Sequence, residues 1–214
     1  MKIVLADDHN LVIEGLRKCF DADPEFEIVG TAADGDELVA LVDRLNPDVA
    51  LVDITMPGLN GIEAVRAIRK NPAVDTRCVI LSMHREREFV NAAFKNGARG
   101  YVLKSASFSE LKEAVHIVMK GKKYVGHKVA DLLLEDMGEI DGGSPSPLSR
   151  LTPRERQTLQ LLAEGLSVKQ IGTKLGISHK TVHTFRASLM QKLECNSVAE
   201  LTRLAIRHGL TNLG

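Results

Sequence analysis

The sequence has few cysteines and no long hydrophobic segment. Its three cysteines, Cys19, Cys78 and Cys195, are far apart and form no CxxC pair, which argues against a disulfide framework or a zinc site and favours the reducing cytoplasm. No apolar run approaches the roughly 18 residues that a membrane span needs. The opening MKIVLADDHN reaches two aspartates too soon for a secretory signal. Because Cys19 and Cys78 lie in apolar stretches, we expect both to be small core residues.

The sequence also lacks net charge, since 28 Lys and Arg balance 28 Asp and Glu. The balance conceals an uneven distribution. Residues 151–214 carry nine Lys or Arg and four Asp or Glu, a net charge of +5, whereas residues 1–123 and 124–150 carry −2 and −3. A basic carboxyl-terminal part on a mildly acidic body hints at a polyanionic partner.

The first 120 residues contain a fivefold alternation of short apolar runs and amphipathic stretches. The predicted strands are KIVLA, FEIVGT, DVALVD, RCVILS and GYVLK, and the predicted helices lie near 10–20, 35–45, 61–70, 86–96 and 107–120. This alternation predicts an α/β fold, a five-stranded doubly wound parallel sheet of order 2-1-3-4-5. In such sheets, functional residues gather outside the carboxyl ends of the strands.

A flexible linker is predicted after this sheet. HKVADLLLED has the pattern of one more short helix, and GEIDGGSPSPLS collects Gly, Ser and Pro, which form no core. We therefore expect a first domain over residues 1–122, a linker with a short helix over 123–148, and a second domain over 149–214.

The second domain is predicted to be all helical, with four helices starting near 153, 168, 179 and 198. Thr152, Ser167 and Ser197 each stand three residues before a Glu or Gln, the spacing of a capping box, and Ser178 is a simple N-cap. Gly176 ends the second helix two residues before the third begins. The short turn between them is typical of a helix-turn-helix.

Five polar residues follow successive strands of the predicted sheet. Asp7 and Asp8 follow the first strand, Asp53 ends the third, and Ser82 and Lys104 end the fourth and fifth. Strands 1 and 3 are neighbours in this order, so the three acids should share one pocket, where a divalent cation would relieve their repulsion. Together with a hydroxyl and a lysine, the cluster suits a phosphoryl group.

Residues 1–120 resemble the receiver domain of two-component response regulators, through ADDH, LVDITMPGLNG, LSM and GARGYVLK. The resemblance implies that Asp53 accepts a phosphoryl group from a histidine kinase. It also implies a Mg²⁺ cofactor held by Asp7, Asp8, Asp53 and the backbone carbonyl of Thr55. The further roles that it implies are phosphoryl pairing for Lys104, a switch for Ser82 and Tyr101, and control of phosphoryl lifetime for Thr55 and His84.

SHKTVHTFRASLMQKL, residues 178–193, has no acid on its exposed face. At 100° per residue, Val182, Phe185, Leu189 and Leu193 form a core stripe, and the opposite face carries short polar groups that suit a major groove. The preceding helix offers cations for phosphates. The candidate DNA-binding residues are Lys169, Thr173, Lys174, Lys180, Thr181, His183, Thr184, Arg186, Ala187, Ser188 and Lys192.

The stretch 148–210 is similar to the DNA-binding domain of the NarL/FixJ (LuxR-type) family, nearly end to end. The resemblance implies that residues 178–193 lie in the major groove and that the last helix, about 197–208, makes dimer contacts. The chain departs from the family at His183, where lysine is common, at Phe185, where histidine is common, and at Gly172, where alanine is usual. Gly172 should cost roughly 1 kcal/mol of helix propensity.

These patterns predict a phosphorylation-switched transcription regulator and not an enzyme. Its expected partners are a cognate histidine kinase, double-stranded DNA, RNA polymerase and, on phosphorylation, a second copy of itself. Two alternatives remain open: the same fold acting without phosphorylation, and an aspartyl-phosphate phosphatase. Thr55 stands where such phosphatases need an acid. A LuxR-type sensor of a small signalling molecule would need an apolar pocket where this chain has acids.

Overall fold

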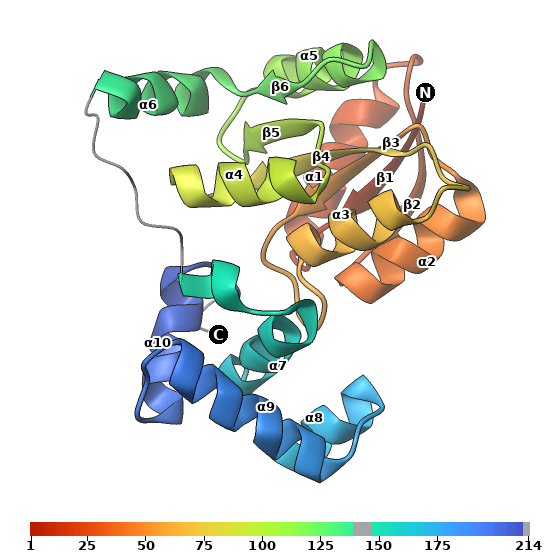
Figure 1. Ribbon diagram of the computed structural model, residues 1–214. Coiled ribbons are helices and arrows are strands. Elements are labelled where there is room, and N and C mark those ends of the chain that lie inside the picture. Colours follow the sequence, from red (N-terminus) through yellow and green to blue (C-terminus); the bar gives the residue numbers. More distant parts are fainter. Residues whose placement is uncertain (139–146, 212–214) are drawn as a thin grey trace. The chain divides into compact units, whose positions relative to one another are not determined.

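The chain divides into two units, Met1–Asp141 and Gly142–Gly214, and the computed structural model describes residues 1–138 and 147–211 of them (Figure 1). Most of the predicted Gly/Ser/Pro-rich linker lies outside the described residues. Within the described ranges, no helix is both long and apolar enough to cross a membrane.

A parallel sheet of order β2-β1-β3-β4-β5-β6 forms the centre of the first unit (Figure 1). Successive residues of a strand point to opposite faces, and in β1 Val4 and Ala6 enter one core whereas Ile3 and Leu5 enter the other. β3, which lies inside the sheet, is buried at every position. The strands are β1 Lys2–Ala6, β2 Glu27–Ala32, β3 Val49–Asp53, β4 Arg77–Ser82, β5 Gly100–Leu103 and β6 Tyr124–Val125.

Helices cover both faces of the sheet. The core on one face takes apolar side chains from α2, α3, α4 and α6, and the core on the other takes them from α1 and α5. The helices are α1 Asn10–Asp21, α2 Gly35–Leu45, α3 Gly61–Lys70, α4 Arg87–Asn96, α5 Phe108–Met119 and α6 His127–Gly138. The predicted doubly wound α/β fold is therefore confirmed.

The predicted count of five strands is wrong by one. β6 adds to β5 through hydrogen bonds from the Tyr124 N–H to the Arg99 carbonyl and from the Gly126 N–H to the Tyr101 carbonyl. Two residues are too few to show an alternating pattern, so no pattern in the sequence indicated this strand. β6 lies in the segment that the sequence pattern assigned to the linker, and the next helix, α6, buries Val129 fully against the sheet.

Local capping explains why the helices of the first unit begin where they do. Asp34, Asn60 and Ser107 each accept a hydrogen bond from the backbone N–H three residues further on. Gly97 ends α4 with φ of 116°, in the left-handed region that favours glycine.

The second unit consists of η1 Pro147–Arg150, α7 Pro153–Ala163, α8 Val168–Leu175, α9 His179–Lys192 and α10 Val198–Arg207. The predicted capping boxes at Thr152 and Ser167 are confirmed, and so are the Ser178 cap and the left-handed Gly176. The box at Ser197 is only half formed, because the Glu200 carboxylate accepts from the Asn196 N–H instead of that of Ser197.

Two predicted core residues are not in the core. Cys19 is exposed, because it lies on the outer side of α1, whereas Cys78 is 3% exposed as expected. Val182, Leu189 and Leu193 of α9 are buried in the second unit, but Phe185 is only half-buried.

Candidate functional site

Asp7, Asp8 and Asp53 meet at the carboxyl ends of β1 and β3. β1 pairs with β3 through Ala6 and Val52, so the residues that follow β1 lie beside Asp53. Asp7 and Asp53 are 3% and 4% exposed, whereas Asp8 is open to solvent. Two buried carboxylates beside an exposed one form a pocket rim that a charged ligand can reach from solvent.

Lys104 is the counter-ion of the two buried acids. Its Nζ lies 2.7 Å from Asp7 Oδ2 and 2.9 Å from Asp53 Oδ2. The position follows from the sheet, since the Lys104 N–H donates to the Ser82 carbonyl at the end of β4. Burial opposes the charge of the ammonium, but the hydrogen bond to Asp7 and the field of Asp53 outweigh it and raise the pKa of Lys104.

The Asp53 carboxyl has a raised pKa of about 6. Burial is the main cause; Lys104 opposes it, and the negative charge of Asp7 adds to it. At neutral pH the group is still mainly ionised, so it is a carboxylate that carries little hydration.

His9 joins the cluster, although the sequence pattern indicated only the start of a helix there. Its Nδ1 lies 2.7 Å from Asp8 Oδ1 and 3.1 Å from Asp7 Oδ1, and its backbone N–H donates to Asp7 Oδ1. Possible ligand atoms of Asp7, Asp8, His9 and Asp53 all lie within 4.8 Å of one another. The carboxylates in this set are ligands that Mg²⁺ prefers.

The loop after Asp53 is held tightly against the acids. Thr55 is 8% exposed, and the Gly61 N–H donates to the Ile54 carbonyl. A Cβ at Gly61 would collide with the backbone carbonyl of Asp53, so a glycine is needed for α3 to begin so close to this strand end.

Ser82 ends β4, and Tyr101 lies on the neighbouring strand β5. Both are fully buried, and Ser82 Oγ accepts from the His84 N–H at 3.0 Å while the Tyr101 hydroxyl donates to the His84 carbonyl at 2.9 Å. The His84 ring stacks on Phe89 of α4, with centroids 4.1 Å apart. These contacts connect the end of β4 to α4 through one short loop.

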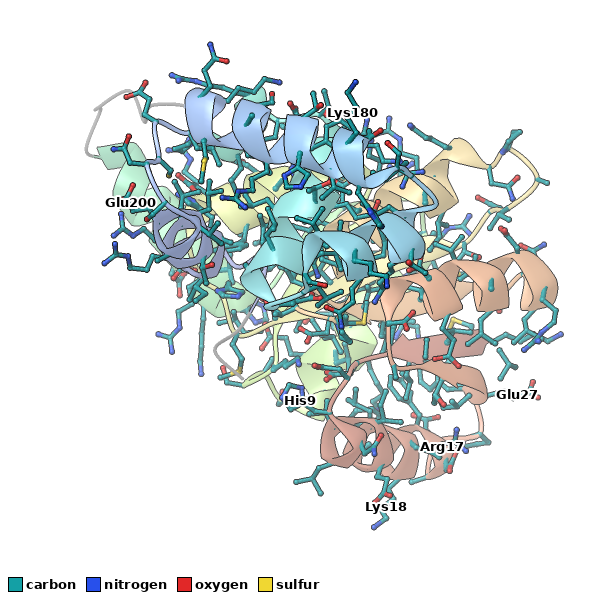
Figure 2. The ribbon with its side chains drawn as sticks, turned by 90° about the horizontal axis from the view of Figure 1, so that it is seen from below. His9, Arg17, Lys18, Glu27, Lys180 and Glu200 are labelled. Carbon is teal, nitrogen blue, oxygen red and sulfur yellow. The ribbon has the colours of Figure 1, made fainter. Side chains whose placement is uncertain are left out.

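In the second unit, α8 and α9 present an exposed face with three lysines and no acid. Lys169, Thr173 and Lys174 are exposed on α8, and Lys180, His183, Thr184 and Ala187 are exposed on α9. Lys180 extends from α9 into solvent (Figure 2). Thr181 and Arg186 lie half-buried at the flanks. Donors, one methyl group and positive charge together match a major groove and its phosphates.

Ser188 and Lys192 are placed differently from the other candidates. The Ser188 hydroxyl donates to Glu155 Oε1 at 2.6 Å, and Lys192 Nζ donates to Glu155 Oε2 at 2.8 Å. Burial raises the pKa of Glu155, but Lys192, Ser188 and Thr152 outweigh it and lower that pKa to about 2. Glu155 therefore ties α9 to α7. The sequence identified Glu155 only as a capping residue, because its partners on α9 are more than thirty positions away.

Gly172 has a packing role that its helix propensity does not reveal. A Cβ at this position would lie 3.0 Å from both His179 Cδ2 and the Ile177 carbonyl oxygen. The missing methyl group lets the His179 ring, at the first position of α9, lie against α8.

Residues 3–116 match the response regulator receiver domain, and residues 149–205 match the luxR family of bacterial regulatory proteins. The chain belongs to the LuxR-type response regulators. Similar response regulators include the transcriptional regulatory protein DegU of Brevibacillus brevis, 36% identical over 98% of this chain and 94% of its own length. Response regulator UvrY of Escherichia coli K12 is 34% identical over 99% of this chain and 96% of its own.

Solved structures of response regulators share both parts. RcsB from Salmonella enterica serovar Typhimurium, bound to promoter P1flhDC in the presence of phosphomimetic BeF3-, is 29% identical, with a TM-score of 0.58 over 95% of this chain and 97% of that one. A response regulator of this family has a kinase as its upstream partner, and its LuxR-type domain binds DNA. Its relatives are transcriptional regulators and not enzymes.

Proposed function

We propose that this response regulator is switched by phosphorylation of Asp53, and that the switch promotes dimerisation and promoter binding. The observation that carries the proposal is the group of Asp7, Asp53 and Lys104, with the ammonium within 3 Å of both buried carboxylates. A buried nucleophile beside a fixed cation stabilises negative charge that is transferred to it.

The transfer is a displacement at phosphorus. A carboxylate oxygen of Asp53 forms the new O–P bond while the P–N bond of a phosphohistidine breaks. The bonding pair returns to the ring nitrogen, which leaves as neutral imidazole when the other ring nitrogen carries a proton. Asp7, Asp8, Asp53 and the Thr55 carbonyl would hold Mg²⁺, whose charge offsets that of the phosphoryl oxygens. Lys104 pairs with an oxygen of the transferred group.

Ser82 and Tyr101 communicate the new charge to α4. The Ser82 hydroxyl moves toward the phosphoryl group and donates to it. This movement disturbs the two hydrogen bonds that the loop at His84 makes with Ser82 and Tyr101. His84 stacks on α4, so the surface of α4, β5 and α5 changes with it. Thr55 and His84 also border the approach of water, and we propose that they set the phosphoryl lifetime.

The exposed residues of α8 and α9 are the proposed DNA contacts. Lys169, Thr173 and Lys174 approach phosphates, while Lys180, Thr181, His183, Thr184, Arg186 and Ala187 lie along the major groove. Ser188 and Lys192 contribute by fixing α9 on α7 through Glu155. α10 makes the dimer contact, and RNA polymerase is the downstream partner. We place this activity in the cytoplasm, where DNA and polymerase are found.

The test compares wild type, Asp53→Asn and the exposed control Asp21→Asn, each with and without acetyl phosphate and Mg²⁺. Intact mass measures phosphorylation, sedimentation measures dimerisation, and fluorescence anisotropy measures binding to DNA selected by the protein from a random pool. We expect wild type and Asp21→Asn to gain mass, dimerise and bind DNA more tightly, and Asp53→Asn to do none of these.

Two other results are informative. Equal DNA affinity in all three proteins, with or without acetyl phosphate, would support a regulator that works without phosphorylation. Phosphorylation of Asp53→Asn at the wild-type level would contradict the assignment of the acceptor.

A further inference from the structure

A cavity of about 360 Å³ lies at the amino-terminal ends of the strands, opposite to the ends that carry Asp53. Arg77, the first residue of β4, and Arg99, which directly precedes β5, border it, whereas Asp53 and Ser82 lie where strands end. The cavity is bounded by α3, α4, the starts of β4 and β5, and the segment before β6. Its lining is Val65, Ile68, Arg69, Val74, Asp75, Thr76, Arg77, Cys78, Phe94, Gly97, Ala98, Arg99, Gly121 and Lys123.

The lining is strongly cationic. It contains Arg69, Arg77, Arg99 and Lys123 but only one acid, Asp75, so its formal charge is +3. Asp75 pairs with Arg77 at 3.2 Å, and its carboxylate is 90% exposed, so the pair is well screened. Within the part of the chain whose side chains the structure describes, Arg99 and Lys123 form no ion pair. An anion entering the cavity therefore meets an excess of positive charge.

Two of the cations are held in place by the fold. Arg69 Nη1 donates to the Lys95 carbonyl at 3.1 Å, and the side chain of Arg69 lies where a Cβ of Gly97 would be. Lys123 Nζ lies 5.5 Å from the centroid of the Phe94 ring. Both side chains are exposed, but each contact reduces the conformational entropy that the side chain would lose on binding.

Part of the wall of the cavity is apolar: Val74 and Phe94 are partly exposed, whereas Val65, Ile68 and Ala98 are at most 2% exposed. The volume of the cavity falls in the lower part of the range, about 300–1,000 Å³, typical of small-molecule sites. Inorganic phosphate alone would leave this wall uncovered. A ligand with an apolar or aromatic body and one anionic group would use both parts of the lining.

We propose that this cavity binds a small organic phosphate, with its phosphate group between Arg99 and Lys123 and its apolar body against Phe94 and Val74. Such a ligand contacts α4 and the segment between α3 and β4 at once. The site gives the receiver domain an input that is separate from the acid cluster.

Phenyl phosphate is a suitable probe, because it combines one phosphate with one aromatic ring and nothing else. It is titrated into the isotopically labelled full chain without Mg²⁺, and backbone amide resonances are followed. We expect saturable shifts at Cys78, Gly97 and Ala98, with a Kd of about 1 mM or tighter. Inorganic phosphate should bind at least about threefold more weakly, since it leaves the apolar wall uncovered.

The variant Arg99→Ala/Lys123→Ala should weaken phenyl phosphate binding at least about tenfold. The matched control Arg17→Ala/Lys18→Ala removes two exposed cations from α1, on the other face of the sheet, and should bind as wild type (Figure 2). Arg99→Glu, a second variant at an exposed position, should also abolish binding. Phosphorylation by acetyl phosphate should persist in all three variants, which separates this site from Asp53.

The proposal would be overturned by wild type that shows no saturable shift at Cys78, Gly97 and Ala98, or by shifts confined to residues around Asp53. Equal affinity in wild type and in Arg99→Ala/Lys123→Ala would also overturn it. Inorganic phosphate binding as tightly as phenyl phosphate would reduce the cavity to an ion site and contradict the role of the apolar wall.

Discussion

Lys104 pairs with two buried carboxylates at once, and its removal should destabilise the first unit. Lys104→Met leaves Asp7 and Asp53 facing each other, and breaking a buried pair in this way costs about 3–5 kcal/mol of the free energy of unfolding. We expect Mg²⁺ to raise the Tm of Lys104→Met more than that of wild type, because the cation takes over the missing charge.

Lys112→Met is the matched control. Lys112 pairs with Asp23, but both side chains are partly exposed, so the loss of stability should be much smaller than in Lys104→Met, with no extra response to Mg²⁺. Thermal unfolding with and without Mg²⁺ measures both variants. Equal destabilisation by the two substitutions would show that Lys104 is not needed as a counter-ion.

Glu155 should make the stability of the second unit depend on pH. Its folded pKa is about 2, below the ordinary 4.5, so its contribution is complete above pH 4.5 and is lost as the pH falls toward 2. The difference corresponds to about 3 kcal/mol. Glu155→Gln should lower the free energy of unfolding of the unit by about that amount at pH 7. It should also reduce the loss of stability as the pH falls from 4.5 toward 2, as urea unfolding between pH 2 and 7 would measure. Glu164→Gln, at the opposite end of α7, is a suitable control, and an unchanged pH profile in Glu155→Gln would refute the assignment.

His183 is exposed on α9 where a lysine is common in the family, and this residue should limit DNA affinity. His183→Lys places a permanent cation on the proposed DNA-binding face, so binding should tighten and the log–log salt slope should steepen by at most about one unit. His208→Lys, beyond the end of α10, serves as the control. Anisotropy titrations at several salt concentrations measure the slope, and an unchanged slope would remove His183 from the interface.

At the scale of elements, α8 and α9 are fitted to each other through Gly172 and His179. Gly172→Ala should gain up to about 1 kcal/mol of helix propensity, but the new Cβ meets His179 Cδ2 and the Ile177 carbonyl at 3.0 Å. We expect little net gain in the single variant, and a larger gain when His179→Ala removes the ring. Denaturant unfolding of the two single variants and the double variant measures this coupling. Additive effects would show that ring and glycine are independent.

Sequence patterns predicted most elements because each carries a local signal. The four carboxyl-terminal helices begin where Thr152, Ser167, Ser178 and Ser197 placed them, and β1 and β4 match their predicted ranges residue for residue. β6 was missed because its pairing with β5 comes from tertiary contact, not from pattern. Phe185 was misplaced because a helical wheel gives direction but not the extent of the neighbouring core.

For the candidate site too, the sequence predicted what depends on strand order and missed what depends on contacts between individual side chains. Strand ends and topology suffice to bring Asp7, Asp8, Asp53 and Lys104 together, since neighbouring parallel strands end at one edge. Three other features depend on side-chain conformations. They are the contacts of His9, the inward pairing of Ser188 and Lys192 with Glu155, and the packing of the His179 ring against Gly172. Residue spacing in the sequence does not determine these.

At the scale of the whole molecule, the charge of the two parts should govern how the protein meets DNA. Residues 151–214 carry +5, and residues 1–123 carry −2. Association with DNA therefore depends on one part, while the other adds slight repulsion that salt screens. This arrangement is compatible with the proposed control of DNA binding through dimerisation, because the first part does not itself compete for the polyanion.

β6 determines where the first unit can be truncated without exposing β5 as the edge strand of the sheet. Without Tyr124 and Val125, β5 would expose unpaired N–H and C=O groups along an apolar strand, which is a template for intermolecular strand addition. A fragment ending at residue 122 should therefore self-associate, whereas one ending at residue 138 should stay monomeric at the same concentration, as light scattering would measure. Two residues, too short to recruit a further strand themselves, protect the sheet from aggregation.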